Sequence, residues 1–293
     1  MSRTLRAVAA LLLAAGLAQA TRAQPVAATD DRGREVALAR PAQRVVALGP
    51  HLVELVYAAG GGARLVGVLR YSDHPEAAHA LPIVGDAFAL NLERIAQLKP
   101  DLVVVWHSGI PARQREQLQR LGVPVFESEI RRVEEIARTL QRIGSLLGTR
   151  AIADAEAAGL QQRWSALQAH YAGRTPVRVF YQLWHQPLMT INGEHIIAQA
   201  VAACGGVNAF AALPALTPTV SWEAAAQSDP QVVATARVDA AQAAPEGRWA
   251  ELTQVDAVRQ HRYALLPPDL LSRMGPRFVD GAQLLCEAID RAR

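Results

Sequence analysis

Hydrophobic residues in this chain form short continuous runs that alternate with segments of helical periodicity. In the first half these runs are rich in β-branched residues and predict buried strands at 44–48, 65–69, 102–106 and 124–126. Helical spacing of apolar residues, ended by glycine or proline, predicts helices at 52–61, 92–99 and 113–122. Continuous apolar strands that alternate with helices are typical of a parallel sheet covered on both faces.

The same alternation starts again after a long helical segment at 149–171, which would span about 35 Å at the rise of an α-helix. In the second half, strands are predicted at 177–183, 231–235 and 263–266. Helices are predicted at 196–204, 222–228, 249–255 and 276–292. The sequence therefore predicts an α/β fold with two doubly wound lobes and a ligand cleft between them. The predicted divisions are an N-terminal lobe at 24–147, opening with a short hairpin or arm at 24–43, a single linking helix at 148–173 and a C-terminal lobe at 174–293.

The first 23 residues have the pattern of a secretory signal peptide. Arg3 and Arg6 precede a short apolar segment at 8–17, and small-residue cleavage sites follow it. No later segment reaches the roughly 18 apolar residues that a membrane helix needs. No cysteine lies near the cleavage region to carry a lipid. We therefore expect residues 1–23 to be removed and the mature protein to be periplasmic.

The net charge limits the kinds of partner, and the cysteine content limits the kinds of cross-link or metal site. The formal net charge is +3 and the basic residues are scattered along the chain, which disfavours nucleic acid as a partner. The two cysteines are Cys204 and Cys286. In an oxidising compartment an even pair favours one disulfide, and two buried free thiols are the alternative. Their spacing suits neither a CxxC redox motif nor a zinc site.

The most informative feature is a weak internal repeat at an offset of 130 positions. Residues 93–104 read ERIAQLKPDLVV and residues 223–234 read EAAAQSDPQVVA, so Glu93 and Glu223 begin matching helices. One interpretation is that any two helix–strand units share a proline turn and an acidic first turn. The other is that the lobes are pseudo-symmetric. Two equivalent glutamates would then suit docking on a two-fold symmetric partner that carries a basic residue on each half.

Ligands of doubly wound sheets bind beyond the carboxyl ends of the strands. The candidate ligand-binding residues lie at or near these ends: Pro50, His51, Tyr71, Phe88, Trp106, His107, Trp184, Asp269 and Arg273. They include four large aromatic residues in a chain that is only 5% aromatic, which suits a large, flat, partly apolar ligand. The alternative is that the tryptophans belong to the core and Tyr71 to an ordinary turn.

Metal binding and catalysis have less support. His51, His107 and His185 are in positions to ligate a metal or haem iron, but the sequence has no HxH, HExxH or histidine-rich tract. It also has no GxSxG elbow, P-loop or GxGxxG motif. We therefore expect a binding protein and not an enzyme, with no catalytic residue, no metal site and no cofactor apart from the captured ligand.

Several segments together resemble one known group of proteins. They read RVVALGPHLVELVYAAGG, RYSDHPEAA, NLERIAQLKPDLVVVWHSG, ACGGVNAF and VSWEAAAQSDPQVV, in that order from residue 44. They resemble the periplasmic cobalamin-binding proteins of ABC importers, which belong to a wider group that also binds haem and iron–siderophore complexes. The resemblance implies two α/β lobes bridged by a rigid helix, with the ligand in the cleft and only modest hinge motion.

The resemblance also implies roles for individual residues. Tyr71, Trp106 and Asp269 match positions that line the ligand cleft in the cobalamin binders. The two helix-starting glutamates match those that meet arginines of the permease dimer, and the two cysteines match the disulfide of the family. Tryptophans expected near 87 and 217 are replaced by Ala87 and Thr217, with Phe88 and Trp184 as aromatic residues elsewhere at the site.

The leading hypothesis is therefore a monomeric periplasmic protein that captures cobalamin or a related corrinoid and delivers it to an ABC importer. It would meet the membrane only through the permease dimer. Haem or an iron–siderophore complex is the alternative ligand. A secreted hydrolase or a sensory module without a transporter are the rival classes.

Overall fold

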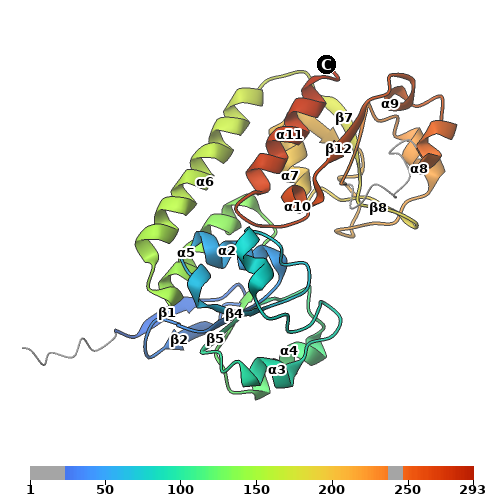
Figure 1. Ribbon diagram of the computed structural model, residues 1–293. Helices are drawn as coiled ribbons and strands as arrows, with labels where there is room; N and C mark the ends of the chain where they lie inside the picture. Colours follow the sequence, from blue (N-terminus) through green and yellow to red (C-terminus); the bar gives the residue numbers. More distant parts are fainter. Residues whose placement is uncertain (1–23, 237–246) are drawn as a thin grey trace, which may run out of the picture.

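The computed structural model describes residues 24–236 and 247–293, so the predicted signal peptide lies outside it. Two α/β lobes are present, and the long helix α6 (Arg150–Tyr171) runs along one side of the molecule beside both (Figure 1). Within the described residues, no helix combines the length and apolar character that crossing a membrane requires. The predicted lobe boundaries at either end of α6 stay predictions.

The N-terminal lobe is built on a parallel sheet with the strand order β4-β3-β5-β6. Its strands are β3 (Val45–Leu48), β4 (Leu65–Val68), β5 (Leu102–Trp106) and β6 (Val125–Ser128). Its main helices are α2 (Pro50–Ala58), α3 (Leu92–Gln97), α4 (Ala112–Arg120) and α5 (Val133–Leu147). Residues of α2 and α5 pack on one face of the sheet, and residues of α3 and α4 pack on the other. Because both faces are covered, all four residues of β3 are buried.

The C-terminal lobe repeats this arrangement with the parallel strand order β10-β7-β11-β12. Its strands are β7 (Val177–Gln182), β10 (Gly206–Asn208), β11 (Val232–Ala236) and β12 (Tyr263–Leu266). Its main helices are α7 (Ile196–Ala203), α8 (Trp222–Gln227) and α11 (Phe278–Asp290). Residues of α7 and α11 lie on one face, and α8 and the 3-10 helix η3 (Gly247–Glu251) lie on the other.

Smaller elements complete the two lobes. The antiparallel hairpin of β1 (Val26–Thr29) and β2 (Glu35–Leu38) precedes the first sheet, as predicted for 24–43. Short 3-10 helices η1 (Gly62–Arg64) and η2 (Glu76–Ala80) flank β4. In the second lobe, β8 (Trp184–His185) and β9 (Leu188–Met189) form a second hairpin. Short helices α9 (Asp256–Arg259) and α10 (Pro268–Leu271) lie on either side of β12.

The internal repeat of the sequence is a structural repeat. Helices α3 and α8, and strands β5 and β11, start and end at positions that differ by 130. Their N-caps match as well: Asn91 accepts a hydrogen bond from the Arg94 amide, and Ser221 accepts one from the Ala224 amide. In each sheet the strand that comes first along the chain lies second, beside the strand that follows it. The lobes are therefore pseudo-symmetric units.

One continuous hydrophobic core joins the lobes. It contains Leu55 of α2, Leu140 of α5, Leu160 of α6, Val201 of α7 and Leu285 of α11, all at most 2% exposed. The outer faces of the two sheets pack in two separate clusters. Large separation of the lobes would expose apolar surface of the shared core to water. The free-energy cost of this exposure is about 25 cal/mol per Å². The packing therefore favours a rigid pair of lobes with little hinge motion.

Cys204, just after α7, and Cys286 of α11 form a disulfide, which decides between the two alternatives left by the sequence. Both sulfurs are buried within the C-terminal lobe. The bond closes a loop of 82 residues that holds most of that lobe, including β10, β11 and β12. Loops of this length lose much conformational freedom in the unfolded chain when they are cross-linked.

Two helices differ from the pattern that the sequence predicts. The helix predicted at 249–255 is wrong: the 3-10 helix η3 is followed by the short helix α9 instead. Trp249 is 1% exposed and packs edge-on against Phe180, so its burial follows from the core of the lobe and not from a helical stripe. Helix α5 is absent from the predicted elements, yet it is the amphipathic helix that joins the first sheet to α6.

Candidate ligand site between the lobes

The first part of the candidate site is an aromatic pair after strands β3 and β5. Pro50 is the first residue of α2, and His51 follows it. The rings of His51 and Trp106 meet edge to face, with centroids 5.2 Å apart. His51 is 2% exposed, and burial, aided by the charge of Arg273, lowers its pKa to about 3. The imidazole is therefore neutral at pH 7.

The loop after β5 leaves room for the indole only because residue 109 is glycine. A Cβ built on Gly109 would lie 2.0 Å from Cε3 of Trp106. The ring therefore rests directly on the backbone of this loop. The sequence places Trp106 at the strand end, but the dependence of its position on Gly109 follows only from the coordinates.

Arg273 brings the C-terminal lobe to this part of the site. It lies between α10 and α11, and its Nη1 contacts Asp73 Oδ1 at 2.6 Å and Glu54 Oε1 at 3.2 Å. Its Nη2 contacts Asp269 Oδ1 at 3.0 Å and donates to the Tyr71 carbonyl at 3.2 Å. Burial lowers the pKa of Arg273, but the three acidic neighbours outweigh it and raise the pKa above its usual value. Arg273 is therefore charged and bridges the lobes.

Glu54 is the buried partner at the centre of this bridge. It lies in α2 at 4% exposure, where Arg277 donates from Nε to Oε2 at 2.9 Å and from Nη2 to Oε1 at 2.6 Å. Such a two-bonded Arg–carboxylate pair is among the strongest polar contacts in proteins. Glu54 is not among the candidates predicted from the sequence. The available signal was a lone acid in the otherwise apolar helix HLVELVYA, because a buried carboxylate requires a partner.

Tyr71 follows β4 and is held in an unusual conformation. Its φ is 67°, in the left-handed region that costs a non-glycine residue about 1–2 kcal/mol. Its side chain is nevertheless 74% exposed, so it is not a core residue. Contacts link Tyr71 to Arg273, whose charge acts on His51, which packs on Trp106. The candidates from β3, β4 and β5 thus lie together with Asp269 and Arg273 of the other lobe.

Two further candidates are exposed aromatic residues. Phe88 is 87% exposed in a loop where Asp86 accepts hydrogen bonds from the amides of Phe88 and Ala89. Trp184 is 48% exposed in the β8–β9 hairpin and donates from Nε1 to the Gln186 carbonyl at 3.0 Å. In Figure 1, β8 lies on the side of the C-terminal lobe that is turned toward the N-terminal lobe. Exposed rings of this size mark interaction sites when they gather on one surface.

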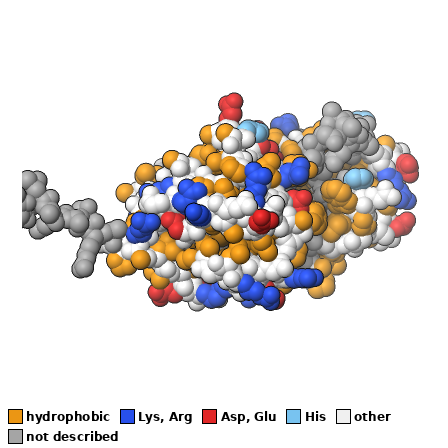
Figure 2. Space-filling model, turned by 60° about the horizontal axis from the view of Figure 1, so that its bottom comes forward, with side chains coloured by type: hydrophobic (Ala, Val, Ile, Leu, Met, Phe, Trp, Pro, Cys, Tyr) orange, Lys and Arg blue, Asp and Glu red, His pale blue; other side chains and the backbone are white. Residues whose placement is uncertain are grey.

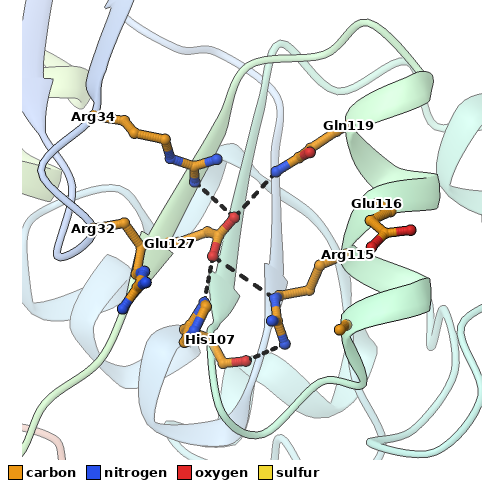
Figure 3. Close-up of a pocket in the computed structure, with 8 residues that line it drawn as sticks. Arg32, Arg34, His107, Arg115, Glu116, Gln119 and Glu127 are labelled. Atoms are coloured by element: carbon orange, nitrogen blue, oxygen red, sulfur yellow. Dashed lines mark hydrogen bonds and ion pairs between the residues drawn. The ribbon is translucent and has the colours of Figure 1, made fainter.

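His107 belongs to a different place. It lines a hollow of about 320 Å³ with Arg32, Arg34, Arg115 and Glu127, between the first hairpin and α4 (Figure 3). Its Nδ1 lies 2.5 Å from Glu127 Oε2. Because neighbouring residues at the end of β5 point in opposite directions, Trp106 contacts α2 while His107 turns toward α4. The structure therefore does not bring His107 to the Trp106 side chain.

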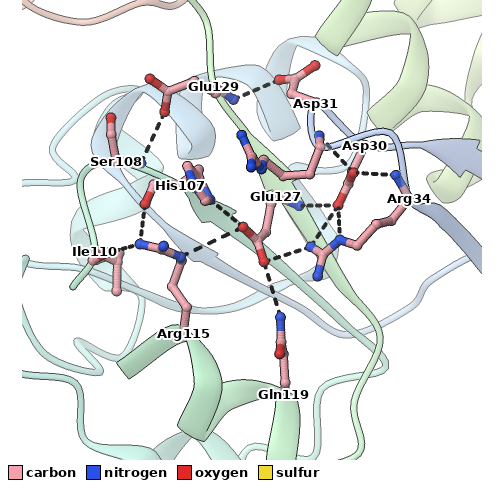
Figure 4. Close-up of polar contacts among 11 residues, drawn as sticks. Asp30, Asp31, Arg34, His107, Ser108, Ile110, Arg115, Gln119, Glu127 and Glu129 are labelled. Carbon is pink, nitrogen blue, oxygen red and sulfur yellow. Dashed lines mark hydrogen bonds and ion pairs between the residues drawn. The ribbon is translucent and has the colours of Figure 1, made fainter. Parts of the chain in front are cut away.

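The charged side chains that line this hollow form ion pairs with one another. Glu127 is 4% exposed and has Arg34 at 2.6 Å and Arg115 at 3.7 Å, in addition to His107 (Figure 4). Burial raises the pKa of Glu127, but the His107 hydrogen bond and the charge of Arg34 outweigh it and lower the pKa below its usual value. Arg115 also donates to the carbonyls of His107 and Ile110. The network thus fixes the loop that follows Trp106 at the end of β5.

The first hairpin holds the same loop from the other side. The Glu129 amide donates to Asp31 Oδ2 at 2.7 Å, and the Ser108 amide donates to Glu129 Oε2 at 3.0 Å. Asp31 also pairs with Arg142 of α5 at 2.5 Å. The turn at Asp30–Gly33, within the hairpin predicted at 24–43, is therefore a support of the loop after β5. An acid inside strand β6 was the available signal for Glu127.

The two predicted docking residues occupy equivalent exposed positions. Glu93 lies in the first turn of α3, where its Oε1 accepts from Gln97 Nε2 at 3.3 Å. Glu223 lies in the first turn of α8, where hydrogen bonds from its own amide and from Ser221 lower the pKa of its carboxyl group. Figure 1 shows α3 and α8 on the parts of the two lobes that lie away from α6. On the face shown in Figure 2, lysine and arginine side chains are spread among hydrophobic and acidic ones.

Within residues 24–236 and 247–293, no cluster of three or more histidine, cysteine or acidic side chains is arranged to hold a metal ion. Residues 237–246, which follow β11 along the chain, lie outside the described residues.

Two pseudo-symmetric parallel sheets, joined by a long helix and presenting aromatic and charged residues at their strand ends, define a two-lobe solute-binding protein.

Comparisons with known proteins agree with this class. The model of the periplasmic binding protein family matches residues 45–270, and the chain belongs to this family. The vitamin B12-binding protein of Vibrio cholerae is 34% identical over 246 residues, which cover 84% of this chain and 88% of that protein. The vitamin B12-binding protein of Yersinia pestis is 35% identical over 249 residues, which cover 85% and 87%.

Solved structures show the same fold. The periplasmic vitamin B12-binding protein BtuF of Vibrio cholerae has a TM-score of 0.79 at 33% identity, covering 86% of this chain and 98% of that one. A periplasmic heme-binding protein of Pseudomonas aeruginosa has a TM-score of 0.75 at 28% identity, covering 85% and 92%. The predicted family and the predicted fold are therefore confirmed.

Proposed function

We propose that this protein captures cobalamin, or a related corrinoid, in the periplasm and delivers it to an ABC importer. The observation that carries the proposal is the similarity to vitamin B12-binding proteins at 34% identity across 84% of the chain. The site agrees with it, because exposed aromatic rings at Tyr71 and Trp184 suit a broad, partly apolar ligand. Binding and release need no covalent chemistry, so no residue has a catalytic role.

The ligand is proposed to bind between the lobes. Tyr71 would stack on it from the N-terminal lobe, over the pair of His51 and Trp106. Asp269 would offer its carboxylate from the C-terminal lobe, where its side chain is 44% exposed beside Arg273. Phe88 and Trp184 would close the rim in place of the tryptophans that the resemblance expects near 87 and 217. His107 would act through the loop that follows Trp106.

Titration of the mature protein with cyanocobalamin, haemin and a ferric siderophore tests the choice of ligand. We expect cyanocobalamin to bind one-to-one with the highest affinity, measured by calorimetry and by quenching of tryptophan fluorescence. Trp106→Ala should weaken binding at least about tenfold, because truncation of a central aromatic contact commonly costs about 2 kcal/mol or more. Failure of cyanocobalamin to bind at millimolar concentration would reject the proposal.

Haem is the second candidate ligand. The relative of Pseudomonas aeruginosa that binds heme is 28% identical, and Tyr71 presents an exposed phenol of the kind that ligates haem iron. If haem were the ligand, haemin would give a shifted Soret band that Tyr71→Phe abolishes. Tyr71→Phe keeps the ring, so it should change corrinoid affinity much less than it changes haem coordination.

Delivery is proposed to use Glu93 and Glu223 as paired contacts for arginines on the two halves of a permease dimer, with the binding protein acting as a monomer. Exposed carboxylates at equivalent points of pseudo-symmetric lobes support this arrangement. The double variant Glu93→Ala/Glu223→Ala should bind cyanocobalamin normally but lose uptake in cells. The matched control is Glu116→Ala/Glu251→Ala, which removes two other acids and should keep uptake. Normal uptake by the first variant would reject the docking proposal.

A further inference from the structure

We infer that Arg273 is a positioning residue, which holds the Tyr71 loop in its ligand-presenting conformation from the opposite lobe. This inference rests on the proposed function, because it concerns how that same site is formed. The geometry that carries it is the contact from Arg273 Nη2 to the Tyr71 carbonyl at 3.2 Å, together with the ion pair to Asp73 at 2.6 Å. The guanidinium of Arg273 thus contacts the loop at two residues, one on each side of Ser72.

The Tyr71 loop needs contacts that stabilise it because its backbone is strained. Tyr71 has a φ of 67°, and positive φ in a bulky residue persists only where the surroundings fix it. The ring itself supplies little restraint, since the side chain is 74% exposed. Local support includes the Ser72 amide donating to the Leu69 carbonyl at 3.3 Å, which closes a turn with Tyr71 as its third residue, and the Arg70 amide donating to the Gly85 carbonyl at 2.9 Å. Arg273 adds contacts to Tyr71 and Asp73 from the opposite lobe, which the local turn cannot supply.

Arg273 is itself rigid enough to act in this way. Its side chain is 12% exposed, and Glu54 and Asp269 hold it at 3.2 Å and 3.0 Å. The guanidinium contacts protein groups through both terminal nitrogens. Its partners are Tyr71, Asp73, Glu54 and Asp269. Asp269 is also placed by its own helix α10, so the effect of Arg273 on the ligand is exerted mainly through Tyr71.

The arrangement couples lobe position to the site. Arg273 belongs to the C-terminal lobe, whereas Tyr71 and Asp73 belong to the N-terminal lobe. A movement that separates the lobes by a few ångströms breaks both contacts at once and frees the Tyr71 loop. Ligand contact from Tyr71 is then lost together with contact from the second lobe, so release requires only a small separation.

Arg277 provides a matched control. It belongs to the same segment, also crosses between the lobes and also pairs with Glu54, but its hydrogen bonds are made to that carboxylate and not to the Tyr71 loop. Arg277→Gln removes both of the close hydrogen bonds to Glu54, whereas Arg273→Gln leaves them in place. Arg277→Gln should therefore lower the melting temperature at least as much as Arg273→Gln, while affecting cyanocobalamin affinity less.

A double-mutant cycle in cyanocobalamin affinity tests the inference. We expect Arg273→Gln to weaken binding about tenfold in the wild-type background and less than about twofold in the Tyr71→Ala background, because the two residues act as one unit. Arg277→Gln should change the affinity less than about twofold in either background. Equal losses for Arg273→Gln in both backgrounds, no loss at all, or an equal loss for Arg277→Gln would each overturn the inference.

A measurement without ligand separates this inference from the proposed function. The chain has 5 tyrosines, so labelling with 3-fluorotyrosine allows the Tyr71 resonance to be assigned by its loss in Tyr71→Phe. Arg273→Gln should shift and narrow this ¹⁹F resonance, as expected for a loop that becomes mobile, and Arg277→Gln should not. If wild-type protein fails to bind cyanocobalamin, the proposed function fails, and this spectrum still decides the role of Arg273. An unchanged resonance in Arg273→Gln would overturn it.

Discussion

Acid should weaken the fold through His51, and the magnitude follows from its burial. The side chain is 2% exposed, and burial lowers its pKa to about 3 from an ordinary value near 6.5. Between these two values the unfolded chain binds a proton that the folded protein does not, so stability falls as pH falls through this window. From pH 7.5 to pH 5, this one residue should cost about 2 kcal/mol of unfolding free energy.

The substitution that isolates this effect is His51→Phe, which keeps a ring against Trp106 and removes the titrating group. Urea unfolding followed by tryptophan fluorescence gives the free energy of unfolding at pH 7.5 and pH 5 for both proteins. His195, whose pKa burial lowers to about 4, contributes equally to both and cancels in the comparison. We expect the wild type to lose about 2 kcal/mol more than the variant over this range. Equal losses in the two proteins would show that protonation of His51 does not limit stability in acid.

Three further predictions follow from contacts of the site and the core. Glu54→Ala removes the buried carboxylate that pairs with Arg277. It should lower the free energy of unfolding, measured by urea titration, by about 3–5 kcal/mol. The control Glu116→Ala changes an exposed residue and should alter this free energy by less than about 0.5 kcal/mol. Gly109→Ala should displace the Trp106 ring and shift its fluorescence, with affinity for cyanocobalamin falling about as far as in Trp106→Ala; an unshifted spectrum would contradict it. Cys204→Ser/Cys286→Ser should lower the unfolding free energy by about 2–5 kcal/mol, and reductant should then have no additional effect on that variant.

Much of the fold was predictable because strands and helices leave periodic signals. The run LVVVW predicted β5 to the residue, and the offset of 130 between Glu93 and Glu223 predicted matching helices that start one residue before them. Capping residues such as Asn91 are local and readable. The helix expected at 249–255 failed because Trp249 is buried by contact with Phe180, a partner that is distant in sequence.

The candidate site was predictable only in part. Strand ends are visible in the sequence, so Trp106 and Tyr71 could be named as candidates, and their contact with a ligand stays a prediction. The bridge between the lobes was not, because Glu54 and Arg273 are 219 residues apart and no local pattern records that they meet. His107 shows a second limit: adjacency to Trp106 suggested a shared site, whereas the alternation of side chains at the end of β5 turns its ring toward Glu127.

A crystal structure of the mature protein grown with cyanocobalamin would locate the ligand and so decide whether the proposed site exists. We predict ligand density between the lobes, with the rings of Tyr71 and Trp106 on the N-terminal side and Asp269 on the other. Clear ligand density on an outer face of either lobe, or a ligand that touches neither Tyr71 nor Trp106, would contradict the proposed site.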